Sequence, residues 1–244
     1  MIIDIHTHVG LDKDGMSQTL EELIARMDSN RIDYAATFPL NEKNQDLISA
    51  SMALLNVNNP RIMPFLRFDP HTTSPDAVES RIDKFRGVKL HPTSQQFDPL
   101  DKKFYPLYEV IQKHAKPLLI HTKSNSSPYA DPDKASLLAD DFPDLDIILG
   151  HFASCSEEAI KMVSKHDNLY LETSIHSLYP VKIEKALAIV GADKVLFGSD
   201  IPYADQELEL LKVKKCRVSP DDMDKMLYRN AARLLKMDAG RTYG

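Results

Sequence analysis

The sequence lacks the features that define several large classes of protein. The 244 residues include only two cysteines, Cys155 and Cys216, which excludes a disulfide framework and a short-spaced cysteine metal site. We therefore expect reduced thiols and a cytoplasmic location. No apolar run approaches the roughly 18 residues that a membrane span requires. The amino terminus has no basic stretch followed by a long apolar run, so we expect no signal peptide.

Positive charge is also scarce. The 30 lysines and arginines stand against 36 aspartates and glutamates, which gives a formal net charge of -6 and disfavours nucleic acid or an anionic membrane as partner. The 8 glycines form no G-x-G-x-x-G at the first strand–helix junction and no P-loop. These absences disfavour an open, doubly wound sheet that binds nucleotides.

What the sequence does contain is a regular alternation of short apolar runs and longer amphipathic runs. The apolar runs predict strands at residues 1–8, 33–38, 62–68, 87–91, 117–121, 146–151, 169–173 and 194–198. Helices are predicted at residues 19–30, 44–55, 74–85, 104–114, 133–141, 157–165, 180–190 and 205–214, with a last helix over 219–236. Eight strand–helix units favour an α/β fold, a (β/α)8 TIM barrel with an extra C-terminal helix, as a single domain over residues 1–244.

The first strand carries the most informative motif. Because side chains on a strand alternate between its two faces, His6 and His8 are predicted to point the same way, together with Asp4. Two imidazoles side by side at the end of a buried strand form half of a metal site.

Histidines recur at the ends of later predicted strands. His91, His121 and His151 end the fourth, fifth and sixth strands, and Asp200 follows the eighth. Active sites of such barrels lie at the carboxyl ends of the strands, so these side chains are predicted to meet at one rim. Three or four nitrogen and oxygen ligands with an open position are what a catalytic zinc requires.

Taken together, these motifs resemble a known family. His6-x-His8, Gly87-Val-Lys-Leu-His-Pro92, Ile120-His121, Gly150-His151 and Phe197-Gly-Ser-Asp200 resemble the amidohydrolase superfamily. The similarity is to the branch that holds amidohydrolase 2 hydrolases and aminocarboxymuconate-semialdehyde decarboxylase-like enzymes. It runs from Met1 to about Leu235 and includes Asn230-Ala-Ala-Arg-Leu-Leu235 in the last helix.

The resemblance implies a catalytic metal site with His6, His8, His121 and Asp200 as its four ligands. It implies that His151 is the catalytic histidine. With a metal-activated water, Asp200 is expected to accept a proton and His151 to stabilise the developing oxyanion. Three nitrogens and one carboxylate suit one divalent ion, foremost Zn, with Mn, Fe or Co as substitutes.

Three cationic or imidazole side chains are candidates for binding a substrate carboxylate: Lys89, His91 and Arg67. Lys89 and His91 face the same side of the fourth strand. A surface ion pair is the stronger interpretation of Arg67, and a structural pairing of Lys89 with Asp4 or Asp200 is also open. In dihydroorotase-like enzymes of the wider superfamily, the corresponding lysine is carboxylated and bridges two metals. On that alternative Lys89, His121 and His151 would hold a second ion, but we favour one.

The sequence offers weaker candidates as well. Either Glu172 and Ser174 or Leu171 and Thr173 are predicted to face the pocket, because each pair shares one face of the seventh strand. Tyr203 is placed to roof the site. The short loop at residues 9–17 predicts a small or open pocket, and the polar run at 124–128 predicts a mobile lid.

The leading functional hypothesis is a metal-dependent hydrolase acting on an amide, lactone or ester-like bond of a small, carboxylated molecule. The runner-up is a non-oxidative, metal-dependent decarboxylase that uses the same site. A TatD-type nuclease is disfavoured because that family has Gly-Glu-x-Gly where this chain has Leu66-Arg67-Phe68-Asp69. A non-catalytic metal-binding barrel is a further alternative, which the complete ligand set disfavours. Dimers are common in the family, which leaves a homodimer open.

Overall fold

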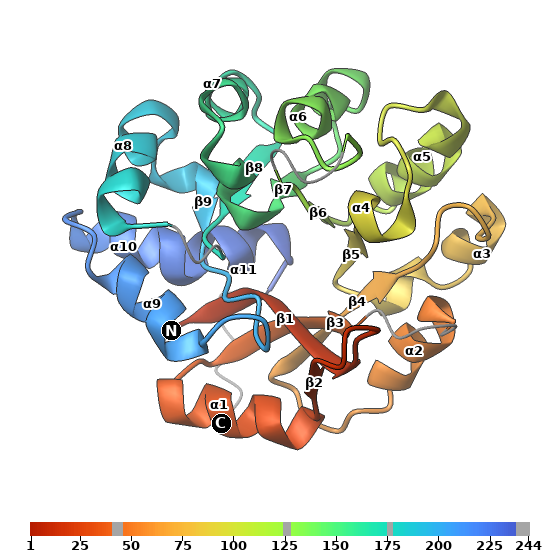
Figure 1. The fold of residues 1–244 in the computed structure, drawn as a ribbon, viewed down its shortest axis with the longest axis horizontal. Coiled ribbons are helices and arrows are strands. Elements are labelled where there is room, and N and C mark those ends of the chain that lie inside the picture. Colours follow the sequence, from red (N-terminus) through yellow and green to blue (C-terminus); the bar gives the residue numbers. More distant parts are fainter. Residues whose placement is uncertain (41–45, 124–127, 175–177, 238–244) are drawn as a thin grey trace.

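The computed structural model, described here for residues 1–40, 46–123, 128–174 and 178–237, is a closed barrel of parallel strands surrounded by helices (Figure 1). The strands are β1 (Ile3–Leu11), β2 (Ser17–Gln18), β3 (Tyr34–Pro39), β4 (Ile62–Arg67), β5 (Gly87–Leu90), β6 (Leu118–Ile120), β7 (Ile147–Leu149), β8 (Leu169–Glu172) and β9 (Val195–Leu196). They follow one another in the order β2-β1-β3-β4-β5-β6-β7-β8-β9, and only the short β2 is antiparallel to its neighbour. Backbone bonds from Ile5 N to Phe197 O (3.0 Å) and from His8 N to Ile201 O (2.9 Å) close the ring.

Helices follow the strands around the outside of the barrel, as the alternation of the sequence predicts (Figure 1). They are α1 (Leu20–Asn30), α2 (Leu47–Leu54), α3 (Pro75–Glu79), α4 (Pro92–Gln95), α5 (Tyr105–Lys113), α6 (Pro132–Asp141), α7 (Glu157–Lys165), α8 (Pro180–Val190), α9 (Gln206–Lys214), α10 (Pro220–Asp224) and α11 (Asn230–Leu234). The predicted barrel is therefore confirmed. Strand β2 and helix α4 were not predicted, because elements of two and four residues are too short to show a periodicity.

Two predicted helices are shorter than expected. The helix that begins after Ser74 ends at Glu79, and a 3-10 turn follows at Ile82–Lys84. The last predicted helix is divided into α10 and α11 by a π-helical stretch, Lys225–Arg229. The starts of both helices agree with the sequence, since Ser74 and Ser219 each cap the helix with a proline in its first turn.

Apolar side chains form two layers. The larger layer lies between the strands and the outer helices. The smaller layer fills the barrel interior with side chains such as Ile3, Ile5, Phe38 and Phe65, and α11 contributes Leu234 to it. Helix α11 thus packs against the barrel interior, while the cavity that His6 and His8 line opens at the carboxyl ends of the strands.

One detail of β1 corrects the sequence prediction. The pairing of β1 with β3 shifts between Asp4 and Thr7, so β1 has one extra residue there, a β-bulge. The bulge reverses the alternation, which lets Ile3 and Ile5 face the interior while His6 and His8 line the cavity above it. Asp4 does not point with the two histidines, because its carboxylate accepts hydrogen bonds from Ser199 and from Gln206 of α9.

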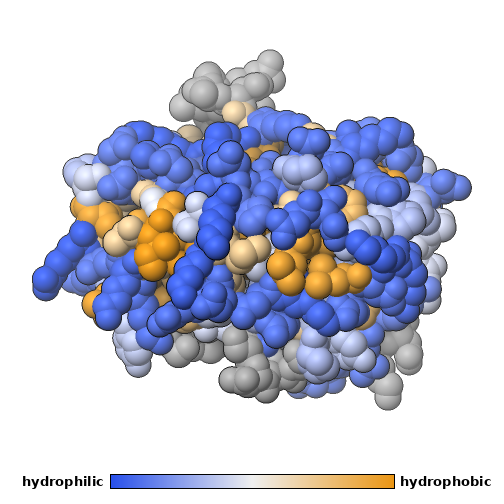
Figure 2. Space-filling view, turned by 90° about the horizontal axis from the view of Figure 1, so that it is seen from above, coloured by the Kyte–Doolittle hydropathy of each residue, from blue (hydrophilic) through white to orange (hydrophobic). Residues whose placement is uncertain are grey.

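The face of the molecule seen in Figure 2 is largely hydrophilic, with small, separate hydrophobic areas. Among the described residues, none of the helices combines the length and the apolar character that a membrane crossing demands.

Candidate metal centre

A cavity of about 660 Å³ opens at the carboxyl ends of the strands, a size that suits a small-molecule ligand. The predicted site residues all line it, from six different strands or the segments that follow them: His6, His8, Arg67, Lys89, His91, His121, His151 and Asp200. Ser174, Tyr203, Asp12 and Thr93 also line the cavity. The barrel therefore brings together groups that are almost 200 residues apart in the chain.

Two imidazole nitrogens converge on one carboxylate oxygen. Oδ1 of Asp200 lies 3.1 Å from Nε2 of His6 and 3.0 Å from Nε2 of His8. The backbone of Asp200 has a φ of 61°, which turns the chain so that its N–H can donate to His6 O at 2.8 Å. Its other oxygen, Oδ2, lies 4.0 Å from Nδ1 of His151.

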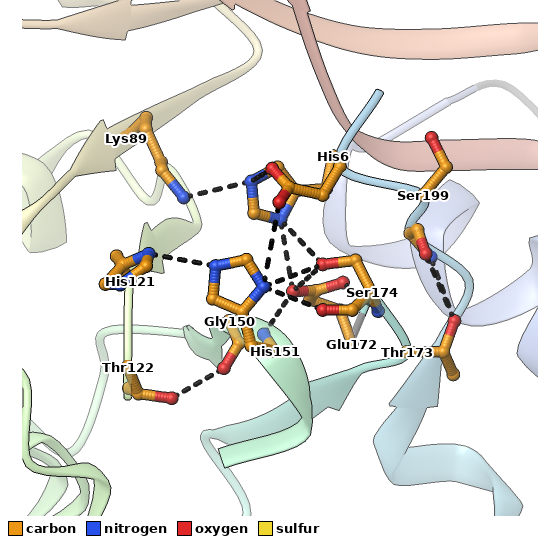
Figure 3. Close-up of polar contacts among 12 residues, drawn as sticks. His6, Lys89, His121, Thr122, Gly150, His151, Glu172, Thr173, Ser174 and Ser199 are labelled. Atoms are coloured by element: carbon orange, nitrogen blue, oxygen red, sulfur yellow. Dashed lines mark hydrogen bonds and ion pairs between the residues drawn. The ribbon is translucent and has the colours of Figure 1, made fainter. Parts of the chain in front are cut away.

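The proton position on His6 follows from its second partner. Nδ1 of His6 lies 3.0 Å from Oε1 of Glu172, which is completely buried (Figure 3). Burial alone would raise the pKa of Glu172, but the charge of His6 and its hydrogen bond outweigh that effect and lower the pKa to about 2. An ionised carboxylate can only accept hydrogen bonds, so His6 carries a proton on Nδ1.

His151 and His121 form a hydrogen-bonded pair (Figure 3). Nδ1 of His151 donates to the backbone carbonyl of Ser174 at 2.7 Å, and its Nε2 lies 2.9 Å from Nδ1 of His121. Because a carbonyl cannot donate, neutral His151 has its proton on Nδ1, and His121 donates to its Nε2. This arrangement leaves Nε2 of His121 as the nitrogen that can bind a cation.

The segment that carries His151 has an unusual backbone. All five residues from His151 to Cys155 have a positive φ, between 48° and 60°. A left-handed turn costs roughly 1–2 kcal/mol per residue for side chains with a Cβ. Strained backbone of this kind concentrates at functional sites, where the surrounding structure holds it in place.

The wall of the cavity contains two buried cationic side chains. Nζ of Lys89 lies 3.2 Å from Nε2 of His6, and burial lowers the pKa of Lys89 to about 7. Lys89 forms no ion pair with Asp4 or Asp200 within 4.0 Å, so the structural pairing considered for it is wrong. Arg67 is only 2% exposed, and the surface ion pair expected for it is wrong too.

The Arg67 guanidinium is incompletely satisfied. Its Nη1 donates to Pro39 O at 2.7 Å, while its buried Nε has no hydrogen-bond partner. Burial lowers the pKa of Arg67 to about 10, so the group stays charged at neutral pH. The hydroxyl of Thr93, also in the cavity wall, is likewise buried without a partner.

The donor set fits a divalent cation. Among the described residues, one group of metal-ligating side chains has donor atoms that all lie within 4.8 Å of one another: His6, His151 and Asp200. His8 adds a nitrogen 3.0 Å from Oδ1 of Asp200, and its pKa is lowered to about 3, mainly by burial, so its imidazole is neutral; its place in the ligand set also stays a prediction. His121 lies one hydrogen bond further away, behind His151, and its place in the ligand set stays a prediction.

Comparison with known proteins decides the family. The amidohydrolase family model matches residues 3–237, nearly the whole chain. The chain belongs to the amidohydrolase family. This confirms the resemblance drawn from the histidine motifs. No curated protein matches this amidohydrolase by sequence.

Solved structures share the fold at low sequence identity. The 5-carboxyvanillate decarboxylase LigW of Sphingomonas paucimobilis has a TM-score of 0.76 at 16% identity, over 97% of this chain and 99% of that one. An uncharacterized TIM-barrel protein of Bordetella bronchiseptica has a TM-score of 0.81 at 20% identity, over 96% and 98%. A dihydroxybenzoic acid decarboxylase of Polaromonas sp. JS666, with bound manganese and the inhibitor 2-nitroresorcinol, has a TM-score of 0.75 at 17% identity, over 100% and 99%.

The family and the manganese of this neighbour support a divalent metal in this amidohydrolase, whereas the choice of zinc stays a prediction. Membership in an enzyme family also supports the expectation of catalysis. The neighbours favour the decarboxylase alternative at least as well as the hydrolase that the sequence put first.

Sequence reasoning missed or only half identified several residues. Of the two pairs on strand β8, Glu172 and Ser174 face His6, while Leu171 packs in the outer layer. Asp12 was missed, yet it lines the cavity, and after burial its charge is the next cause that raises the pKa of Tyr203. Tyr203 covers His8 edge-on, with 5.5 Å between the ring centres. Asp12 lies on the β1–β2 hairpin, which the sequence showed only as a short loop. The predicted lid falls largely on residues 124–127, outside the described residues.

Proposed function

We propose that this protein is a metal-dependent, non-oxidative decarboxylase of a small carboxylated molecule. The observation that carries the proposal is the buried Arg67 guanidinium, which has a free Nε and lines the same cavity as the metal donor set. A buried cation without a carboxylate partner is costly unless a ligand supplies the anion. Decarboxylases among the solved structures of the same fold support the choice of reaction.

The substrate carboxylate is held by Arg67, with Lys89 and His91 beside it. Arg67 offers a planar set of donors that matches a carboxylate, and Lys89 adds a point charge. His91 stacks on His121 at 3.7 Å between ring centres, and burial holds its pKa well below the usual range, so it is a neutral donor or acceptor.

We assign the metal to His6, His8, His121 and Asp200, as one ion. Zinc suits three nitrogens and one carboxylate, and the Polaromonas neighbour makes manganese the first substitute to test. A two-ion site with a carboxylated Lys89 is the alternative, because Lys89 is buried against His6. When bound, the cation polarises substrate oxygens and withdraws electron density from the carbon that loses its carboxylate.

His151 and Asp200 move the protons of the reaction. Oδ2 of Asp200 is the carboxylate oxygen that neither imidazole of the His6-x-His8 motif contacts. Burial alone would raise the pKa of Asp200, but the nearby imidazoles hold it well below its usual range, so the ionised carboxylate first takes up a proton from solvent and then passes it to the substrate carbon. The carbon–carbon bond to the carboxylate breaks, carbon dioxide leaves, and a proton takes its place on the carbon. The Nδ1–H of His151 stays on the Ser174 carbonyl, so His151 needs a second proton on Nε2 to act on the substrate. With that proton, Nε2 donates to the substrate oxygen that gains negative charge instead of accepting from His121.

Hydrolysis is the second candidate. The matching family model is described as an amidohydrolase, and Oδ2 of Asp200 is equally able to take a proton from an attacking water. In that case an amide, lactone or ester-like bond breaks, and an amine or alcohol leaves in place of carbon dioxide.

The test is a product assay on a panel of small aromatic and unsaturated carboxylic acids, lactones and amides, with protein loaded with zinc or manganese. We expect carbon dioxide from at least one acid and no amine or alcohol. Arg67→Met should raise KM for that acid about 10- to 100-fold, the loss of one charged hydrogen-bonded contact. The control is Arg26→Met, whose guanidinium pairs with Asp205 on the surface. Release of amine or alcohol without carbon dioxide would replace the proposal by hydrolysis, and no turnover by metal-loaded protein would refute both.

A further inference from the structure

A glutamate that does not touch the cavity lies directly behind the metal donor set. Glu172 ends strand β8, is completely buried, and is absent from the residues that line the cavity. A buried carboxylate is costly unless hydrogen bonds and an opposite charge compensate it. The groups that compensate the buried charge of Glu172 therefore indicate its role.

Within the described parts of the chain, four hydrogen bonds reach the carboxylate, and all come from residues of the site. Oε1 accepts from Nδ1 of His6 at 3.0 Å, from the Ser174 hydroxyl at 2.8 Å and from the backbone N–H of His151. Oε2 accepts from the backbone N–H of Ser174 at 2.8 Å. Among the described residues, its only ion pair is with His6 (Figure 3). One carboxylate thus connects a predicted metal ligand with the predicted catalytic histidine.

The chain also makes room for this carboxylate. A Cβ on Gly198 would lie 2.3 Å from Oε2 of Glu172, and a Cβ on Gly150 would lie 3.6 Å from Oε1. These glycines belong to the Gly198-Ser-Asp200 and Gly150-His151 segments that carry the chemistry. The absence of a side chain at Gly198 is therefore a requirement of the Glu172 position.

We propose that Glu172 is the positioning residue of the metal centre. Glu172 accepts a hydrogen bond from the Nδ1–H of His6, so the unprotonated Nε2 is the nitrogen that faces Asp200 and binds the cation. By accepting the His151 backbone N–H with the same oxygen, it fixes the distance between the metal and the proton-transfer histidine. This inference rests on the proposed metal centre, and Glu172 itself touches neither metal nor substrate.

A glutamine at this position separates shape from charge. In Glu172→Gln the side chain keeps its size, but one of its two polar atoms becomes an NH2 group. In one orientation the NH2 group faces the Ser174 N–H, so two donors meet and that hydrogen bond is lost. In the other it donates to His6 Nδ1 and moves the His6 proton to Nε2, which blocks the metal-binding nitrogen.

The first measurement is metal affinity of protein stripped with a chelator and titrated with Zn²⁺ in competition with a coloured chelator. We expect Glu172→Gln to weaken binding about 10- to 100-fold, as is typical of partners behind a metal-binding histidine. The control is Val163→Ala on helix α7, which leaves a cavity in the outer layer without touching the site and should bind as the wild type does. Equal affinity of Glu172→Gln and wild type would overturn the proposal, as would an equal loss in Val163→Ala.

The second measurement needs no variant. In zinc-loaded wild-type protein with ¹⁵N-labelled histidine, we expect His6 to show a proton on Nδ1 that exchanges slowly with water, because it is buried against Glu172. A His6 ring that binds zinc through Nδ1 would overturn the proposal even if Glu172→Gln did not fold. Failure of wild-type protein to bind any divalent cation would refute the metal centre itself, which is a distinct outcome.

Discussion

Replacing Gly198 by alanine adds a single methyl group, yet it should destabilise this protein strongly. The added Cβ would lie 2.3 Å from Oε2 of Glu172 and 3.1 Å from Cβ of His6. The first distance is about 1 Å short of ordinary van der Waals contact. Glu172 is completely buried and does not line the cavity, so its side chain has no open space to move into.

The cost follows from the contacts that Glu172 would lose. A shift of about 1 Å breaks or lengthens its bonds to His6 and to the Ser174 N–H, and hydrogen bonds to a charged group each contribute about 1.5–3 kcal/mol. Alanine also lowers the conformational entropy of the unfolded chain, which stabilises the folded protein by about 0.4–1 kcal/mol and offsets part of this loss. The expected net loss in the free energy of unfolding is about 3–5 kcal/mol.

The assay is urea unfolding of metal-free protein, followed by far-ultraviolet circular dichroism, with chelator present so that metal binding does not contribute. The matched control is Gly191→Ala, where no atom lies within 4 Å of the new Cβ but φ is +77°. With ψ 158°, that backbone lies in a region essentially restricted to glycine and should cost alanine about 1–3 kcal/mol. A loss at Gly198 no larger than the loss at Gly191 would refute the close packing of the carboxylate against the glycine.

Further predictions follow from other parts of the molecule. Arg31 ends helix α1 in the left-handed region with φ 57° and is exposed, so Arg31→Gly should raise the free energy of unfolding by about 0.5–1 kcal/mol in the same assay. His114 pairs with Asp83 and Glu79, and these hydrogen bonds raise its pKa above 6.5. Its contribution to stability is thus complete below pH 6.5 and is lost as pH rises through the raised pKa, so the stability difference between wild type and His114→Gln should shrink at alkaline pH. A cost that stays constant with pH would contradict that pairing. Zn²⁺ or Mn²⁺ added to chelator-treated protein at a free concentration about 100 times its Kd should raise the free energy of unfolding by about 2.7 kcal/mol. An unchanged Tm would contradict the metal centre.

The strength of the sequence prediction differs from one element to the next. Helix α1 was recognisable because its apolar residues repeat at helical spacing. The structure adds a capping box between Thr19 and Glu22 at its start. Helix α4 and strand β2 were not recognisable, because local propensity is uninformative over two to four residues. The left-handed turn after His151 was also unrecognisable, because it contains no glycine, and only the surrounding packing holds it.

The candidate site shows the same division. The order of the motifs and the strand–helix alternation were enough to bring His6, His8, His121, His151 and Asp200 to one rim. The direction of Asp4 was wrong because a bulge in β1, which depends on pairing with β3, reverses the alternation. Arg67 was placed on the surface because nothing local distinguishes an arginine that caps a strand from one that lines a cavity.

By itself, the sequence determined the barrel, the family and the candidate site residues that line one cavity, because periodicity and motif order are local properties of the chain. Only the tertiary structure decided which of those groups touch and in what protonation. The pairing of Glu172 with His6 joins positions 166 residues apart. Hydrogen bonds and burial between distant strands, which no local pattern encodes, fix the proton on His6 and leave the Nε of Arg67 without a hydrogen-bond partner.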